Sequence, residues 1–93
     1  MSFNQTSATE KAKRDLAKRA GVAESEVETV SVDETDFPDM SLGATAAGEM
    51  AAQMISTGWR INLRAGEKNY EYRADKYQLR LCNYKGTNHV IES

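Results

Sequence analysis

The fold is decided by residues 59–82, which read WRINLRAGEKNYEYRADKYQLRLC. Three runs in this stretch alternate between apolar and polar side chains, a pattern that is typical of half-buried β-strands. Their apolar positions are Trp59, Ile61 and Leu63, then Tyr70, Tyr72 and Ala74, then Tyr77, Leu79 and Leu81. The links at 65–68 and 75–76 are short enough for tight turns. We therefore predict an antiparallel meander that is apolar on one face and hydrated on the other.

A helix is predicted before the meander. Ser7 and Glu10 form a capping-box pattern at its start, and Gly21 is placed to end it with a left-handed backbone. An alanine-rich stripe between these positions has helical spacing and includes Leu16. Because small side chains let a helix approach closely, we expect this helix to lie on the sheet.

The segment between helix and meander predicts one strand and a long connection. Residues 27–37 alternate as a strand with Val30 and Val32 on one face, and a proline ends the strand because it has no N–H for a ladder. Residues 38–49 are rich in small side chains, and connections of that length are often functional or mobile. Residues 50–56 stay undecided, since their composition favours a helix and their phase favours a strand.

Together these elements predict a single α+β domain over residues 1–93, with one N-terminal helix packed on a four- or five-stranded antiparallel sheet. Residues 1–6 and 86–93 are expected to be loose termini. Cys82 is the one cysteine, so an internal disulfide is impossible. The chain starts without the basic and apolar segments of a signal peptide, and no apolar run approaches membrane-spanning length. We therefore expect a cytoplasmic protein, unless a leader has been removed.

Charge is distributed unevenly along the chain. Residues 21–49 carry eight acidic side chains and no basic one, whereas the net charge of the whole chain is only −2. An exposed block of one sign attracts partners of the opposite sign over a distance. This block could therefore steer a basic partner.

Support for catalysis or metal binding is weak in this sequence. A nucleophile needs a base beside it, and the one pair available, Cys82 and His89, lies in no motif that marks it. One cysteine and one histidine exclude the usual zinc sets. The acidic side chains of 33–39 lack the spacing of a calcium loop and are expected to form a solvated strand edge. We expect no enzyme activity, no metal and no cofactor.

Nucleic-acid binding is a weaker alternative. Four arginines and a tyrosine fall on or near the hydrated phase of the meander, namely Arg60, Arg64, Arg73, Arg80 and Tyr84. Basic side chains with an aromatic on one sheet face could follow a phosphate backbone. The net negative charge and Glu71 within the same patch favour the ordinary polar face of a sheet instead.

Protein binding is the function that we expect. The candidate contact residues lie in 37–58, around the glycine-flanked connection, and are Phe37, Asp39, Met40, Ser41, Leu42, Gly43, Met50 and Met54. Methionine adapts to irregular partner surfaces, but it also fills gaps in small cores. The alternative is that the apolar residues of this segment close the open end of the sheet.

Several short motifs follow one another in a fixed order between residues 8 and 82. They are Ala20-Gly21-Val22, Phe37-Pro38-Asp39-Met40-Ser41-Leu42-Gly43, Ala47-Gly48, Gln53, Gly58-Trp59-Arg60-Ile61, Tyr70-Glu71-Tyr72 and Leu81-Cys82. In this order they resemble a family of small bacterial domains of uncharacterised function, whose central motif reads Trp-Pro-Asp-x-Ser-Leu-Gly-Cys-Pro. Here Ala44 replaces the motif cysteine and Phe37 replaces the tryptophan. If the family pairs that cysteine with the terminal one, Cys82 has lost its partner, which fits a reducing compartment.

The layout of one helix followed by a curved antiparallel sheet also resembles the cystatin-like arrangement. That resemblance concerns the fold alone and does not carry inhibition with it. It nevertheless suggests an alternative function, a protease inhibitor that presents the 38–49 connection and the 66–67 turn to a protease cleft.

Overall fold

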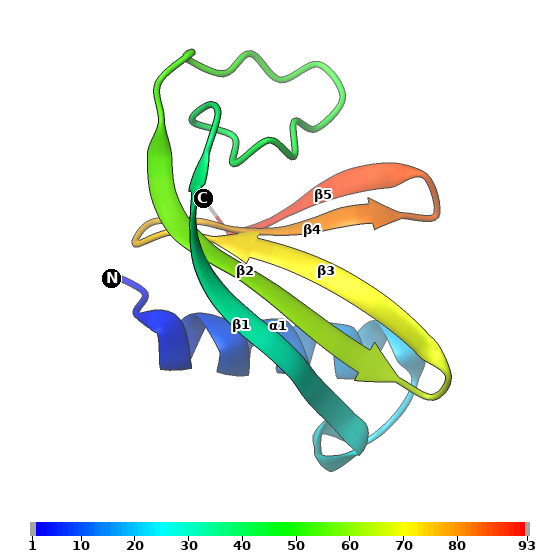
Figure 1. Ribbon diagram of the computed structural model, residues 1–93. Coiled ribbons are helices and arrows are strands. Elements are labelled where there is room, and N and C mark those ends of the chain that lie inside the picture. The colour runs from blue at the N-terminus through cyan, green and yellow to red at the C-terminus, as the bar shows by residue number, and fades with distance from the viewer. Residues whose placement is uncertain (1, 93) are drawn as a thin grey trace.

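The strands are arranged in the order of the sequence. In residues 2–92, which the computed structural model describes, the order β1-β2-β3-β4-β5 gives one five-stranded antiparallel sheet (Figure 1). The elements are helix α1 (Gln5–Ala20), the short 3₁₀ helix η1 (Glu24–Glu26), and strands β1 (Val27–Phe37), β2 (Ser56–Ala65), β3 (Lys68–Ala74), β4 (Leu79–Tyr84) and β5 (Thr87–Glu92). Helix α1 covers one face of the sheet. The predicted α+β class, with one N-terminal helix packed on an antiparallel sheet, is confirmed.

Helix α1 begins before the predicted cap. Asn4 is the N-cap residue: its Oδ1 accepts a hydrogen bond from the Ser7 backbone N at 2.8 Å, and the Ser7 Oγ accepts one from the Asn4 N at 2.9 Å. The predicted pairing of Ser7 with Glu10 is therefore wrong, because Asn4 is an equally good cap and takes Ser7 as its reciprocal partner. At the other end, Gly21 has a φ of 70° and ends the helix as predicted.

One apolar core fills the space between α1 and the sheet. Leu16 and three alanines of α1 pack on the inward side chains of the strands. The buried sheet residues are Val27, Ile61, Leu63, Ala65, Tyr72, Ala74, Leu79 and Leu81, with Trp59 packed half-buried against them. The predicted inward phase of β2, β3 and β4 is confirmed at these positions. Gly58 permits a close approach, since a Cβ there would lie 2.1 Å from the Ala74 carbonyl oxygen.

Two apolar side chains of the predicted alternation, Val30 and Tyr77, are exposed. Val30 lies at a register shift in β1, where it is an extra residue with no partner on β2. Such a bulge breaks the alternation, so Val30 is exposed while Val32 is half-buried against the core. Tyr77 lies in the turn before β4, where the Asp75 Oδ1 accepts a hydrogen bond from its backbone N at 2.8 Å. The turn takes Tyr77 out of the ladder and leaves it exposed.

Both ends of the chain contribute more structure than the loose termini predicted for 1–6 and 86–93. Thr87–Glu92 form strand β5, which pairs with β4, and Ile91 packs against the core. The polar composition of β5 gives too weak an alternation to predict a strand. Phe3 also packs against the core, and its backbone N donates to a carbonyl of the β3–β4 turn at 2.7 Å. Positions 1 and 93 lie outside the described residues.

Residues 38–55, which we call the cap loop, lie over the sheet face opposite α1 (Figure 1). The undecided stretch 50–56 is neither helix nor strand until β2 begins at Ser56. The loop folds back on itself, because the Met40 backbone N donates to the Ala52 carbonyl at 2.9 Å. The sheet is therefore covered by a helix on one face and, over the part that carries Arg73 and Arg80, by an irregular loop on the other.

Candidate functional site

The outer face of the sheet holds the cap loop by hydrogen bonds to its backbone carbonyls. Four side chains donate: Gln78 Nε2 to Met40 O at 2.7 Å, Arg73 Nη1 to Leu42 O at 2.8 Å, Arg80 Nη1 to Ala44 O at 3.2 Å and Asn88 Nδ2 to Thr45 O at 3.0 Å. Each of these carbonyls would otherwise need water or another donor, since buried polar groups are almost always paired. The sheet therefore fixes the path of the first half of the loop.

An ion pair holds the second half. Both carboxylate oxygens of Glu49 accept from the Arg80 guanidinium, with Nη2 to Oε2 at 2.7 Å, and Arg80 is only 4% exposed. This bidentate contact, with a hydrogen bond from the Ala46 backbone N, lowers the pKa of Glu49 to about 2. Arg80 was predicted to lie on the hydrated face. It is buried because the loop covers that face and supplies both a carboxylate and a carbonyl for it.

A tight turn at residues 39–43 shapes the start of the loop. The Asp39 Oδ1 accepts from the Ser41 Oγ at 2.6 Å, from the Ser41 N at 2.9 Å and from the Gly43 N at 3.0 Å. These bonds lower the pKa of Asp39, and the bond from the Ser41 hydroxyl has the largest effect. Gly43 has a φ of 66°, and a Cβ there would lie 2.8 Å from Arg73 Nη1. Asp39, Ser41 and Gly43 therefore serve the fold of the loop.

The predicted contact anchors Phe37 and Leu42 are buried rather than exposed. Phe37 is 1% exposed and Leu42 is 0% exposed, and Ser41 is buried beside them. The bulge in β1 shifts its phase, so that Phe37 faces the cap loop, where the Arg73 guanidinium lies 5.4 Å from its ring centroid. These residues form a second, smaller core between loop and sheet. The alternative interpretation, that they close the open end of the sheet, fits them better.

Other residues of the predicted segment are exposed, and we call them the apolar ridge. Met50 is 97% exposed, Ile55 73%, Met54 64% and Met40 42%. Met40 joins the ridge because its backbone pairs with Ala52 and its sulfur accepts from the Ser56 Oγ. Ile55 was missed in the sequence analysis, because its phase places it within a strand that in fact begins one residue later.

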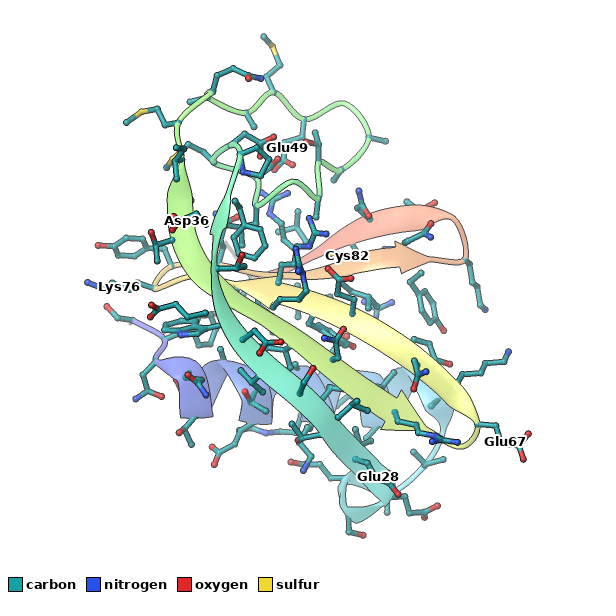
Figure 2. All side chains as sticks on the ribbon, in the orientation of Figure 1. Glu28, Asp36, Glu49, Glu67, Lys76 and Cys82 are labelled. Carbon is teal, nitrogen blue, oxygen red and sulfur yellow. The ribbon has the colours of Figure 1, made fainter. Side chains whose placement is uncertain are left out.

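Acidic side chains border the ridge. Asp33, Glu34 and Asp36 are exposed on β1, which is the edge strand of the sheet. Asp36 lies opposite Thr57 in the β1–β2 ladder and accepts from its Oγ1 at 2.7 Å, which places it beside the end of the ridge. Figure 2 shows Asp36 at the base of the cap loop and Glu28 at the far end of the strand.

The arginine face that was considered for nucleic acid is largely engaged within the chain. Arg60 and Arg73 both lie against Glu71, at 3.4 Å and 2.6 Å, and Arg80 pairs with Glu49. Tyr84 lies with the helix instead, since the Arg19 guanidinium of α1 is 5.3 Å from its ring centroid. The expected patch of free arginines with an aromatic is therefore not assembled.

The positions of the 38–49 connection and the 66–67 turn count against a protease inhibitor that presents both to one cleft. The 38–49 connection follows the end of β1 at which Phe37 pairs with Ser56, whereas the 66–67 turn follows the other end of β2. The ten-residue strand β2 separates the two by about 30 Å, at roughly 3.3 Å per residue. Figure 2 shows Glu49 and Glu67 at opposite ends of the molecule. The two segments do not form one wedge for a protease cleft.

The groups considered for chemistry are dispersed. Burial raises the pKa of the Cys82 thiol to about 11, so the thiolate that a nucleophile needs is disfavoured. No hydrogen bond joins Cys82 to His89 in the part of the chain that the structure describes, and His89 lies against the Tyr84 ring instead. Among residues 2–92, no three side chains of histidine, cysteine, aspartate or glutamate gather as a metal site requires.

Comparison with known proteins places the chain in a family. No curated protein and no solved structure matches it, so the cystatin-like label rests on the resemblance in layout alone. No helix in the described ranges combines the length and the apolar character that crossing a membrane requires. A family model described as a domain of unknown function, DUF8738, matches residues 9–82, which is most of the chain. The resemblance to a family of small domains of uncharacterised function is thereby confirmed, and the chain belongs to the DUF8738 family.

Proposed function

We propose that this domain is a non-enzymatic binding module whose protein partner contacts the apolar ridge within residues 37–58. The observation that carries the proposal is the exposure of Met50, Met54 and Ile55, which are 97%, 64% and 73% exposed within six residues of chain. Covering exposed apolar side chains with a partner is favourable, because it removes apolar surface from water. Methionine side chains adapt to partners of irregular shape.

The ridge is presented by a loop that is already positioned. The carbonyl contacts of Arg73 and Gln78 and the Glu49–Arg80 ion pair hold the cap loop without any partner. A preorganised loop loses less conformational entropy on binding than a disordered one. This supports a binding role for a segment that has no regular secondary structure.

The partner that best fits this surface has an apolar groove bordered by lysine or arginine. The ridge ends beside Asp36, and Asp33 and Glu34 continue the negative charge along β1. Complementary charge at the rim accelerates association and is weakened by added salt. Association with such a partner should therefore slow as the salt concentration rises.

The test is a capture experiment with matched variants. The immobilised domain is exposed to an extract of its own cells, retained proteins are identified, and each is purified and titrated against the domain. Met54→Ser combined with Ile55→Ser should abolish binding of the true partner. Val30→Ser is the control, because Val30 is also an exposed apolar residue but lies on β1 away from the loop.

Comparing the two variants distinguishes specific binding at the ridge from non-specific adhesion. A partner lost from the double variant and retained by the Val30→Ser control supports the ridge. A partner retained by the double variant, or lost equally from both, contradicts the proposal. Thermal unfolding of both variants should match the wild type, since exposed substitutions change stability by about 0.5 kcal/mol or less.

A further inference from the structure

Strands β3 and β4 separate along their length and leave a groove between them. Their ladder runs from the pair Ala74–Leu79 to the pair Glu71–Cys82 and ends there, whereas β3 continues to pair with β2 as far as Lys68. Figure 1 shows β3 and the β4–β5 hairpin spreading apart beyond this point. The groove has a volume of about 540 Å³ and is lined by Lys68, Asn69, Tyr70, Glu71, Cys82, Asn83, Tyr84 and Lys85.

The backbone explains why the strands separate. Asn83 and Lys85 have positive φ angles of 51° and 52°, and the Asn83 backbone N donates to the Asn88 Oδ1 at 2.8 Å. The end of β4 is therefore directed toward β5 and away from β3. Residues 68–70 of β3 pair with β2 along one edge, and no strand in the described part of the chain pairs with their other edge.

An unpaired strand edge offers hydrogen bonds in a fixed geometry. In an antiparallel strand, successive residues direct their N–H and C=O groups to opposite sides. Within residues 68–70, at least one residue therefore directs both groups into the groove. Such an edge is a template for an added strand, which is a recurring way of binding extended peptides.

The charge of the groove selects the kind of peptide. Lys68 and Lys85 are exposed at its walls, and neither forms an ion pair within residues 2–92. The carboxylate of Glu71, which also lines the groove, lies against two arginines, with its Oε2 3.4 Å from Arg60 Nε and 2.6 Å from Arg73 Nε. The free charge in the groove is thus positive, and it complements aspartate and glutamate side chains.

We infer that this groove binds a short acidic peptide segment in an extended conformation, which adds to the free edge of β3 with its carboxylates directed at Lys68 and Lys85. The Tyr70 and Tyr84 rings, with centroids 6.0 Å apart, close the helix side of the groove and leave the outer side for the peptide. The site lies on different strands from the apolar ridge, so it does not depend on the proposed function.

The first test is the charge dependence of binding. A fluorescein-labelled peptide of alternating glutamate and valine, blocked at both ends, is titrated with the protein and followed by fluorescence anisotropy. Lys68→Glu and Lys85→Glu should each weaken binding about tenfold, which corresponds to about 1.4 kcal/mol. Lys76→Glu is the matched control, because Lys76 is an exposed lysine at the opposite end of the same hairpin (Figure 2).

The control decides between a specific groove and diffuse attraction. Binding should be nearly unchanged in Lys76→Glu. Equal weakening in Lys76→Glu and Lys68→Glu, or no binding of the peptide to the wild-type protein, would overturn the inference. A lysine–valine peptide of the same length should not bind.

Two further measurements test the geometry. The peptide methylated at alternate backbone nitrogens cannot add to a strand edge on its methylated side, so its binding should be lost for one of the two methylation phases. Cys82 is the one thiol of the chain and lines the groove, so saturating peptide should slow its alkylation at mildly alkaline pH. Unaltered binding of both methylated peptides, or an unaltered alkylation rate, contradicts strand addition at this site.

Discussion

The two faces of the sheet are covered by different means. Beneath α1, apolar side chains from a helix and from the strands interlock, and the Tyr72 hydroxyl donates a hydrogen bond to the Asp15 carboxylate of the helix at 2.7 Å. Beneath the cap loop, Phe37 and Leu42 form a small core, and the cover is held by polar contacts from Arg73, Arg80 and Gln78 to loop carbonyls. A helix satisfies its own backbone and needs only an apolar stripe to dock. An irregular loop does not, so the sheet must supply the missing donors.

The largest effect is expected on the helix side. Ile61 is fully buried in the core beneath α1, so Ile61→Ala removes apolar contacts and leaves a cavity. We expect a loss of about 2–5 kcal/mol in the free energy of unfolding. Urea denaturation followed by circular dichroism measures it. A loss well below this range would mean that the helix-side core is loosely packed.

Leu42→Ala makes the same kind of change on the loop side. Leu42 is also fully buried, but its neighbours belong to an irregular loop that can close over the missing atoms more easily than a helix can. We expect a loss near the lower end of the range for such substitutions, about 2 kcal/mol. If Leu42→Ala costs as much as Ile61→Ala, the two faces are equally rigid and the comparison between them fails.

The ion pair of the cap loop should contribute less than either core, and its contribution should depend on pH. Glu49→Gln leaves the buried Arg80 guanidinium without its carboxylate, which should cost about 1–2 kcal/mol at neutral pH. The folded-state pKa of Glu49, about 2, lies below its ordinary value of 4.5, so the contribution is complete above pH 4.5 and is lost as the pH falls toward 2.

The difference in stability between wild type and Glu49→Gln should therefore shrink progressively in acid. Glu67→Gln is the control, because Glu67 is exposed in the β2–β3 turn. Denaturation curves across this pH range measure both variants. A difference that stays constant down to the lowest pH would show that Glu49 contributes by packing and not by charge.

The smallest effect is expected at the ridge. Met50 is almost fully exposed, so Met50→Ser should change the free energy of unfolding by about 0.5 kcal/mol or less. A thermal melt compared with the wild type is sufficient. A substantial loss would show that Met50 packs against the loop in solution and would remove it from the proposed contact surface.

The same contrast decides what could be predicted from the sequence. The helix and the inward phase of Ile61, Leu63 and Leu79 follow from periodicity, because a regular element repeats its burial pattern. Arg80 has the same phase as other hydrated positions, and its partner Glu49 lies 31 residues earlier in an irregular loop. No local pattern reports such a contact. Periodicity also cannot show that Leu42 is buried, since a turn has no repeat.

For the same reason, the candidate surface could be predicted only in part. Met50 and Met54 were identified from composition and are exposed, whereas Phe37 and Leu42 were identified by the same argument and are buried. Large apolar residues in a long connection either cover a sheet or project from it, and composition does not distinguish the two.

The sequential order of the strands has a consequence for how the chain folds. Strands β2 to β5 are joined by short turns, so their pairing closes small loops and can form quickly. The pairing of β1 with β2 must instead close the whole of residues 38–55, at an entropic cost that grows with the logarithm of loop length. Strand β1 should therefore join the preformed β2–β5 meander late. Until it does, β2 is itself an open edge, and the slow step of folding is also the step most exposed to aggregation.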